Sequence, residues 1–283
     1  MTSPDKLIAF QGAVGANSDI ACRTVYPEMT SLPCDTFADA FDAVQSGRAL
    51  LAMIPIDNTV AGRVADIHHL LPDSGLQIIG EQFERINHQL LALTGTKIED
   101  IKEVHSHIHA LNQCRGLIAE LGVKPVVHAD TAAAAADIAK WADPTKASIS
   151  TRLAAEVYGL DILKSDIEDA EHNTTRFVIL AREGKSYSAG TPDMMTSFVF
   201  RVRNIPAALY KAMGGFATNG VNMTKLESYV SEGFVVAQFY AEVEGHPDDI
   251  GLKLALEELA FFSHEVTVLG VYPANAYRKF TDA

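Results

Sequence analysis

Apolar residues over the first 180 positions form short runs that alternate with helical repeats. Residues 7–10 and 49–56 are apolar runs of strand length, as expected of buried parallel strands. Between them, apolar residues at 37, 40, 41 and 44 mark one face of a helix that we expect Thr36 to cap. Further strands are predicted at 76–79, 89–93, 126–128 and 177–180, and further helices from Asn17 or Ser18 toward Tyr26 and at 107–120, 131–141 and 150–158. This alternation predicts a mainly parallel sheet with helices on both faces.

A small, polar segment at 183–196 is followed by a region with a different rhythm. The elements expected there are, in order, a strand at 197–202, a helix from Pro206 to Thr218 ended by Asn219-Gly220, a hairpin of 221–229 with 234–243 through 231–233, a helix at 252–262 and a strand at 265–271. The order βαββαβ is typical of ferredoxin-like domains. We therefore predict one domain over 5–182, a linker over 183–196 and a second domain over 197–277.

The composition is that of an ordinary globular protein, with 48% hydrophobic and 21% charged residues over 283 positions. No apolar run approaches the ~18 residues of a membrane span, and no basic segment precedes a signal-length apolar core, so we expect a cytoplasmic protein without a membrane partner. Three cysteines without metal-like spacing fit a reducing compartment. A formal charge of −13 argues against nucleic acid as a partner, and it requires local donors for any anionic substrate.

Four polar segments follow predicted strands, where open α/β sheets bind ligands: 12–18, 55–62, 106–114 and 172–177. Glycines and a helix start in the first segment can bring backbone N–H groups to an anion. Asn58 and Thr59 in the second are neutral donors. In the last, Thr175 stands beside Arg176, whose planar guanidinium can bind a carboxylate through two hydrogen bonds. Each segment taken alone is equally well explained as an ordinary turn or surface loop.

Three histidines at alternate positions raise the question of a metal site. On a strand, His105, His107 and His109 would share one face. No acidic partner lies at ligand spacing, and apolar residues at 110, 111, 114, 117 and 118 repeat as on a helix. We therefore expect a helix that begins near Ser106 or His107, and no metal.

Taken together, these segments resemble the prephenate dehydratase family of bacterial type. Its members carry a glycine-rich opening, then Pro-Ile-Glu-Asn-Ser…Gly, Ser-His-Pro-Gln-Ala-Leu…Gln-Cys, Thr-Ala-Ala and Asn-x-Thr-Arg-Phe. The five counterparts here stand in the same order, at 12–18, 55–62, 106–114, 131–134 and 173–177. The likeness runs from Leu7 to about Tyr277. The departures are Asp57 and Thr59 for Glu and Ser, Ile108-His109 for Pro-Gln, and Ala16-Asn17 for Thr-Phe.

The resemblance implies a carbon–oxygen lyase that converts prephenate to phenylpyruvate, CO2 and water in phenylalanine biosynthesis, with no cofactor. Aromatisation of the ring drives the reaction, so the enzyme needs a donor at the C4 hydroxyl, fixed carboxylates and little water. Thr175 matches the family's essential threonine and is the expected donor, a role for which His107 is less favoured. The residues expected to bind substrate are Arg176, Phe177, Asn173, Asn58, Thr59, Asn17, Ser18, Ser106, Gln113 and Thr131.

The second domain resembles the ACT domain that senses amino acids in this family. Residues 207–209 correspond to its Gly-Ala-Leu motif, with Ala207 for Gly. Residues 220–228 correspond to its second motif, whose usual Arg-Pro continuation is Tyr229-Val230 here. The resemblance implies inhibition by L-phenylalanine and a homodimer or homotetramer through the ACT domains. The expected effector-binding residues are Ala207, Ala208, Leu209, Asn219, Gly220, Asn222, Leu226, Glu227 and Ser228.

The implied fold is α/β: a two-lobed, mainly parallel-sheet catalytic region like that of periplasmic binding proteins, followed by a ferredoxin-like ACT domain. The catalytic lobes are expected at about 5–80 plus 175–182 and at 81–174. Two other functions fit the same motifs. An arogenate dehydratase performs the same elimination on the amino-acid form of the substrate. A non-enzymatic amino-acid sensor would need no Thr-Arg-Phe motif, and the presence of that motif argues against this function, as does the absence of an export signal. For the second domain, a ferredoxin-like domain used only for dimerisation is the less favoured alternative.

Overall fold

The computed structural model describes residues 3–170, 172–230 and 237–280. The chain divides into two compact units, 1–64 with 82–177 and 65–81 with 178–283. Over the described residues, no helix combines the length and the apolar character needed to span a membrane.

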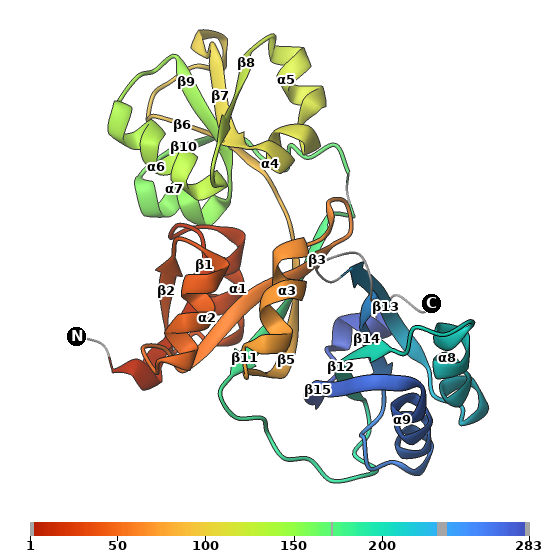
Figure 1. The fold of residues 1–283 in the computed structure, drawn as a ribbon. Coiled ribbons are helices and arrows are strands. Elements are labelled where there is room, and N and C mark those ends of the chain that lie inside the picture. Colours follow the sequence, from red (N-terminus) through yellow and green to blue (C-terminus); the bar gives the residue numbers. More distant parts are fainter. Residues whose placement is uncertain (1–2, 171, 231–236, 281–283) are drawn as a thin grey trace. The chain divides into compact units, whose positions relative to one another are not determined.

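The first sheet begins at the N-terminus and has strand order β2-β1-β3-β11-β5, with the short β4 paired to β3. Its strands are β1 (Leu7–Gln11), β2 (Thr30–Cys34), β3 (Leu51–Asn58), β4 (Gly62–Arg63), β5 (Gln77–Arg85) and β11 (Thr174–Ala181). Strand β1 lies between β2 and β3 and is parallel to both, as expected of the parallel sheet predicted from the sequence. Helices α1 (Asn17–Val25) and α2 (Phe37–Gln45) pack against these strands, and α3 (Ala65–Asp73) follows β4 (Figure 1).

The second sheet has the order β10-β6-β9-β7-β8. Its elements are β6 (Gln89–Ala92), β7 (Glu103–His107), β8 (Lys124–His128), β9 (Lys146–Ser150) and β10 (Asp161–Lys164), with α4 (Ile108–Gln113), α5 (Arg115–Leu121), α6 (Thr131–Trp141) and α7 (Arg152–Tyr158). Strand β7 is parallel to β8 and β9, whereas β6 is antiparallel to β9 and β10. The sheet is therefore mixed, with parallel pairs at its β7 side.

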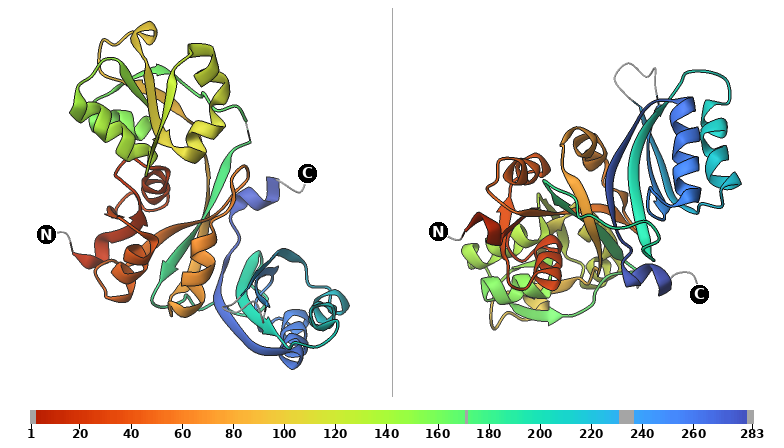
Figure 2. Two further views of the ribbon diagram at one scale, coloured as in Figure 1. Left: turned by 45° about the horizontal axis from the view of Figure 1, so that its top comes forward. Right: turned by 90° about the horizontal axis from the view of Figure 1, so that it is seen from below.

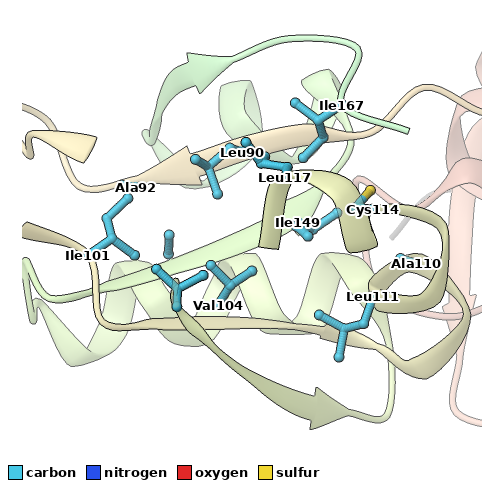
Figure 3. Packing of buried hydrophobic residues seen from close by; sticks show 12 residues of the cluster. Leu90, Ala92, Ile101, Val104, Ala110, Leu111, Cys114, Leu117, Ile149 and Ile167 are labelled. Atoms are coloured by element: carbon cyan, nitrogen blue, oxygen red, sulfur yellow. The ribbon is translucent and has the colours of Figure 1, made fainter. Parts of the chain in front are cut away.

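Helices cover both faces of this second sheet. Val104 of β7 joins an apolar cluster with Leu111, Cys114 and Leu117 of α4 and α5, and Figure 3 shows these side chains converging between strands and helices. The next residue of β7, His105, points the other way and meets Trp141 of α6. One strand thus packs helices on two faces, as the strand-and-helix alternation predicts.

The third sheet is antiparallel throughout and has the order β13-β14-β12-β15. Its elements are β12 (Met194–Val202), α8 (Ala208–Thr218), β13 (Met223–Val230), β14 (Ala237–Glu244), α9 (Ile250–Phe262) and β15 (Ser263–Pro273), followed by a 3-10 helix at Ala276–Phe280. Helices α8 and α9 lie side by side on one face of this sheet in all views (Figures 1 and 2). Their apolar side chains pack on Phe198, Phe200 and Phe239. The order βαββαβ predicted from sequence is confirmed.

The structure differs from the sequence predictions at several elements. Strands β2, β4, β7, β9 and β10 and helix α3 were not predicted, because these strands are short and half polar and the apolar-run criterion passes over them. The helix expected over 107–120 is two helices, because the backbone leaves the helical region at Cys114. The last three residues of the expected linker belong to β12, where Met194 and Met195 are buried. The predicted hairpin turn at 231–233 lies outside the described residues.

Candidate active site around Thr175

Thr175 lies at the start of β11, next to the end of β3. Asn58 is the last residue of β3, and its Nδ2 donates to Thr175 Oγ1 (2.9 Å) and to Asn173 Oδ1 (2.8 Å). The Asn58 Oδ1 in turn accepts the backbone N–H groups of Val60 (2.9 Å) and Ala61 (2.7 Å). A turn directly after β3 therefore fixes the Asn58 amide, and the amide fixes the Thr175 hydroxyl oxygen.

The polar chain continues from Asn173 into the second lobe of the same unit. Asn173 Nδ2 donates to Gln113 Oε1 (2.9 Å), at the end of α4. His88 Nε2 lies 2.9 Å from the same Gln113 oxygen. Both His88 and Asn173 are almost fully buried. Burial lowers the pKa of the His88 imidazole, against the opposing influence of Gln113 and Glu168, so the ring is neutral at neutral pH.

Sequence reasoning brought together Asn58, Gln113, Asn173 and Thr175 but missed His88. The signal that could have found it is the polar triplet Asn87-His88-Gln89 directly before the apolar residues of β6. The triplet also comes directly after the carboxyl end of β5 at Arg85, and ligands of open α/β sheets bind outside the carboxyl ends of strands. No family motif quoted above includes it.

Thr59 has a role in the backbone rather than an open hydroxyl. Its Oγ1 donates to the His172 carbonyl (2.6 Å) and accepts the Thr174 N–H (2.9 Å). Its own N–H donates to the Thr174 carbonyl (3.0 Å). Thr59 therefore binds the start of β11, and its hydroxyl, expected from the sequence to be a substrate donor, already donates to a backbone carbonyl.

Arg176 and Phe177 do not face the site as the sequence-based roles require. Arg176 is buried, its Nη1 lies 3.7 Å from Asp57 Oδ2, and its guanidinium lies over the Phe83 ring at 5.9 Å. Alternate residues of a strand point to opposite faces, so Arg176 and Asp57 lie on one side while Thr175 and Asn58 lie on the other. Phe177 is 1% exposed and belongs to the core. The guanidinium of Arg176, expected from the sequence to bind a substrate carboxylate, thus lies beside the Asp57 carboxylate of the protein itself.

The opening segment is held against α7 by backbone carbonyls. Thr151 Oγ1 donates to the Gly15 carbonyl and Tyr158 Oη to the Val14 carbonyl (2.8 Å). Gly15 has φ of +91°, and a Cβ there would lie 2.9 Å from Ala154 Cα, so only glycine allows this approach. The turn is therefore built rigidly into the unit.

The N-terminus of α1 has open donors. Its N-cap is Ala16, and not Asn17 or Ser18 as expected, so no side chain caps the helix. The side chain that could do so, Asp19, instead accepts the Gly15 N–H (2.8 Å) and pairs with Arg23. First-turn N–H groups have no acceptor within their own helix. Asn17 and Ser18 thus stand at a helix start suited to an anion.

Ser106 and Thr131 lie where the sequence placed them but have different partners. Ser106 is fully buried in β7 and donates to the Ile149 carbonyl (2.6 Å), so its hydroxyl holds two strands together. At α6, the N-cap is Asp130, which accepts the N–H groups of Ala132 (2.6 Å) and Ala133 (2.9 Å). The donors expected at Thr131 are therefore already occupied by a carboxylate.

The three alternating histidines do not converge. His105 contacts His128 and Trp141, whereas His107 caps α4 and its ring meets that of His109. The helix start near Ser106 or His107 is confirmed. In the described part of the chain, no group of three or more His, Cys, Asp or Glu side chains is arranged to hold a metal ion.

The residues expected to bind an effector fall into separate places in one chain. Ala207 precedes the first residue of α8, and Asn219 follows its last, so the 11-residue helix separates them by about 18 Å. On β13, Leu226 and Ser228 pair with Ala241 and Phe239, on the side of the sheet that packs α8 and α9. Glu227 points the other way and lies 3.6 Å from His68 of α3.

Comparisons with known proteins agree with the arrangement of the elements. The family model described as "Prephenate dehydratase" matches residues 8–185. A bifunctional N-acyl-homoserine lactone acylase/prephenate dehydratase of Komagataeibacter europaeus is 51% identical over 276 residues, covering 97% of this chain and 98% of the relative. Arogenate dehydratase 2 of Petunia hybrida is 36% identical, covering 95% and 72%. The structure of prephenate dehydratase from Arthrobacter aurescens in complex with L-Phe superposes with a TM-score of 0.87 at 30% identity, covering 96% and 91%.

Proposed function

The chain belongs to the prephenate dehydratase family, and from this membership we propose that it converts prephenate to phenylpyruvate, CO2 and water. The observation that carries the proposal is the hydrogen bond from Asn58 Nδ2 to Thr175 Oγ1. Because the oxygen accepts this bond, the hydroxyl proton of Thr175 is left to be donated to another acceptor. That acceptor is the C4 oxygen of the substrate, which must leave.

In the proposed reaction, the bond between C1 of the ring and its carboxylate breaks and releases CO2. Its electron pair enters the ring and expels the C4 hydroxyl, which ends as water after taking up a proton. A threonine hydroxyl is too weak an acid to be ionised at neutral pH, so Thr175 acts as a positioned hydrogen-bond donor. The neutral amides of Asn58, Asn173 and Gln113 surround it without placing a fixed positive charge near the carboxylate that must depart.

The substrate carboxylates require donors elsewhere, since Arg176 is paired with Asp57. The uncapped N-terminus of α1, with the N–H groups of Asn17 and Ser18, is the best candidate among the sequence-derived residues. A helix N-terminus favours a negative charge by about 0.3–1 kcal/mol at an exposed site. Ser18→Pro would remove one donor while Pro remains compatible with the first turn, and an increased KM at nearly constant kcat is the expected result.

Replacement of Thr175 tests the mechanism. Loss of one positioned donor typically lowers kcat by roughly 10²–10³, so Thr175→Ala should fall in this range while its melting temperature stays close to that of the wild type. Thr175→Ser keeps the hydroxyl and should retain a substantial part of the rate. A Thr175→Ala variant with wild-type turnover would remove this residue from the mechanism. Full activity in the presence of EDTA is also expected, because the proposed reaction uses no metal.

Arogenate is the alternative substrate, because a relative named arogenate dehydratase matches 95% of this chain. The two substrates differ at the side chain, where prephenate has a keto group and arogenate an ammonium. We propose prephenate as the better substrate, because the family model over residues 8–185 and the 51% identical relative are both named for prephenate dehydratase. Side-by-side kcat/KM values decide the point.

A second candidate activity comes from the 51% identical relative, whose name includes N-acyl-homoserine lactone acylase. The near-complete coverage of both chains favours a test of this activity here. Incubation with an acyl-homoserine lactone and chromatographic detection of the free homoserine lactone would reveal it. If Thr175→Ala removes dehydratase activity and leaves acylase activity intact, two separate sites are present.

For regulation, we propose that L-phenylalanine binds the third-sheet domain and inhibits the enzyme, and that the domain boundaries expected at 5–182 and 197–277 separate these roles. Support comes from the ferredoxin-like order of β12 to β15 and from the L-Phe complex of the Arthrobacter aurescens relative. The expected effector residues lie apart in one chain, so the proposal includes a dimer or tetramer in which a second chain completes the site. Calorimetry with no binding of phenylalanine to the full chain would contradict it.

A further inference from the structure

His88 ends a chain of polar side chains whose other end is Thr175. From one end to the other, the contacts are His88 to Gln113 (2.9 Å), Gln113 to Asn173 (2.9 Å), Asn173 to Asn58 (2.8 Å) and Asn58 to Thr175 (2.9 Å). Every link has the length of a good hydrogen bond. All five residues belong to one compact unit.

The direction of each hydrogen bond in this chain follows from its anchored end. A backbone N–H can only donate, so the Asn58 atom that faces the N–H groups of Val60 and Ala61 is its oxygen. The Asn58 nitrogen therefore faces Asn173 and Thr175, and both of its hydrogens are donated there. This assignment does not depend on telling oxygen from nitrogen in a side-chain amide.

The directions of the remaining hydrogen bonds determine which nitrogen of the His88 imidazole carries the hydrogen. Asn173 must present its oxygen to Asn58, so its nitrogen faces Gln113, and Gln113 must present its oxygen to Asn173. His88 Nε2 contacts that same oxygen, and an amide oxygen can only accept. His88 Nε2 therefore carries a hydrogen, and the neutral ring has its bare lone pair at Nδ1.

The surroundings of His88 hold the ring in this state. The residue is 2% exposed, and its Nδ1 has no hydrogen-bond partner in the described part of the protein. Its backbone N–H donates to Glu168 Oε2 (2.9 Å), and its carbonyl accepts the Ile167 N–H (3.0 Å). Burial disfavours the charged imidazolium. The ring is thus fixed by its backbone and makes one directional side-chain bond, to Gln113.

We propose that His88 is a positioning residue for the dehydration: its Nε2–H holds the Gln113 oxygen, so that the chain of amides keeps Thr175 Oγ1 as an acceptor. The Thr175 proton then remains available for the leaving oxygen of the substrate. The chain is anchored at two ends, by the turn after β3 and by His88. Without His88, Gln113 keeps a single side-chain bond and can turn away from Asn173. This inference rests on the proposed function and deepens it.

Two substitutions of His88 separate the donor from the bulk of the ring. His88→Met fills a similar volume without a donor and should lower kcat about tenfold, the usual effect of one lost hydrogen bond, with KM changed less than about twofold. His88→Gln places an amide N–H close to the position of Nε2 and should recover kcat to within about threefold of the wild type. Wild-type kcat in His88→Met, or equally low kcat in both variants, would overturn the proposal.

A double-mutant cycle with Thr175 asks whether His88 acts through the hydroxyl. If it does, adding His88→Met to Thr175→Ala should lower the residual rate by less than about twofold. A further tenfold loss would show that His88 acts independently of Thr175. His105→Gln is the matched control, because His105 is also a buried histidine of this unit but takes no part in the hydrogen-bond chain from His88 to Thr175. It should leave kcat unchanged.

The tautomer can be measured without any enzymatic activity. In ¹⁵N-histidine NMR spectra at pH 7, the His88 signal, assigned by its loss in His88→Gln, should show a protonated Nε2 and a bare Nδ1. A proton on Nδ1, or on both nitrogens, would overturn the inferred direction of the chain. If the tautomer is as inferred and no phenylpyruvate is formed by the wild type, the proposed function fails while the hydrogen-bond chain stands.

Discussion

Neighbouring residues of β11 face different environments, and this separates their roles. Thr175 receives a hydrogen bond from Asn58 in the polar chain, whereas Arg176 is buried beside Asp57 and Phe83. Motif matching treats the two as a unit because they are adjacent in sequence. Strand geometry divides them, since successive side chains point to opposite faces. We therefore propose that the Thr175 hydroxyl takes part in the reaction and that the Arg176 guanidinium stabilises the fold.

For Arg176, the prediction concerns stability rather than substrate binding. Arg176→Lys keeps the charge but loses the planar guanidinium, so it should lower the free energy of unfolding by about 1–3 kcal/mol and leave KM unchanged. Asp57→Asn should cause a similar loss, and the two losses should not add in the double variant. A rise in KM with an unchanged melting temperature would return Arg176 to the substrate site.

Ala207 occupies a backbone conformation that suits glycine. Its φ is +60°, in the left-handed region, at a position where the ACT motif has glycine. A residue with a Cβ costs about 1–2 kcal/mol there, partly offset by the smaller entropy of the unfolded chain. Ala207→Gly should therefore raise the free energy of unfolding by up to about 1 kcal/mol, measured by urea denaturation. A loss of stability would show that the strain is absent.

At the scale of elements, the C-terminal 3-10 helix is fastened to two strands by Arg278. The guanidinium contacts Glu81 of β5 at 2.7 and 2.8 Å and Glu242 of β14 at 3.1 Å. The side chains of Glu81 and Glu242 are 0% and 1% exposed. Two buried carboxylates thus share the guanidinium of Arg278, and these ion pairs connect the 3-10 helix Ala276–Phe280 to β5 and β14.

Removal of this arginine should be costly. Arg278→Ala removes a cation that two buried carboxylates share, and breaking a buried ion pair typically costs about 3–5 kcal/mol of unfolding free energy. The matched control is Arg48→Ala, because the Arg48–Asp42 pair is exposed on both sides and should contribute less than about 1 kcal/mol. Equal losses in the two variants, followed by chemical denaturation, would contradict the role of Arg278. For the same reason, effector experiments should use the intact chain. Truncation near residue 190 would remove the contacts of Arg278 with Glu81.

The sequence alone predicted some elements of the fold and missed others. The apolar runs of β1 and β3, the helix capped by Thr36 and the order of the third sheet were predictable from periodicity and capping. Polar strands such as β9 were not, because their pairing partners lie far away in sequence. Family motifs located Asn58, Gln113 and Asn173 in the candidate site. Only the three-dimensional structure reveals that the polar groups of Thr59, Ser106 and Arg176 bind other parts of the protein. The partner of a side chain is a property of the fold, and no local pattern encodes it.

Over the whole molecule, buried imidazoles link stability to pH. Burial lowers the pKa of His88, His105 and His107 below the ordinary value of 6.5. Below pH 6.5, these histidines bind protons more readily in the unfolded chain than in the folded chain, so the unfolded state is stabilised relative to the folded state. Their contribution to stability is complete above pH 6.5 and is lost as the pH falls through the folded-state pKa values.

We therefore expect the free energy of unfolding to decrease between pH 7 and pH 5, where most carboxyl groups stay ionised. One proton corresponds to a slope of at most about 1.4 kcal/mol per pH unit. His105→Gln removes one of these groups and should flatten the dependence. Identical pH dependences for His105→Gln and the wild type would contradict this account.

The central claim is that Thr175 and its chain of amides serve the dehydration of prephenate, and product formation tests it most directly. The purified full chain is incubated with prephenate or with arogenate, and phenylpyruvate is read from its absorbance in base while phenylalanine is quantified in parallel. The account predicts phenylpyruvate from prephenate at a rate that Thr175→Ala lowers by roughly 10²–10³. Product from arogenate alone, or a Thr175→Ala variant as fast as the wild type, would contradict it.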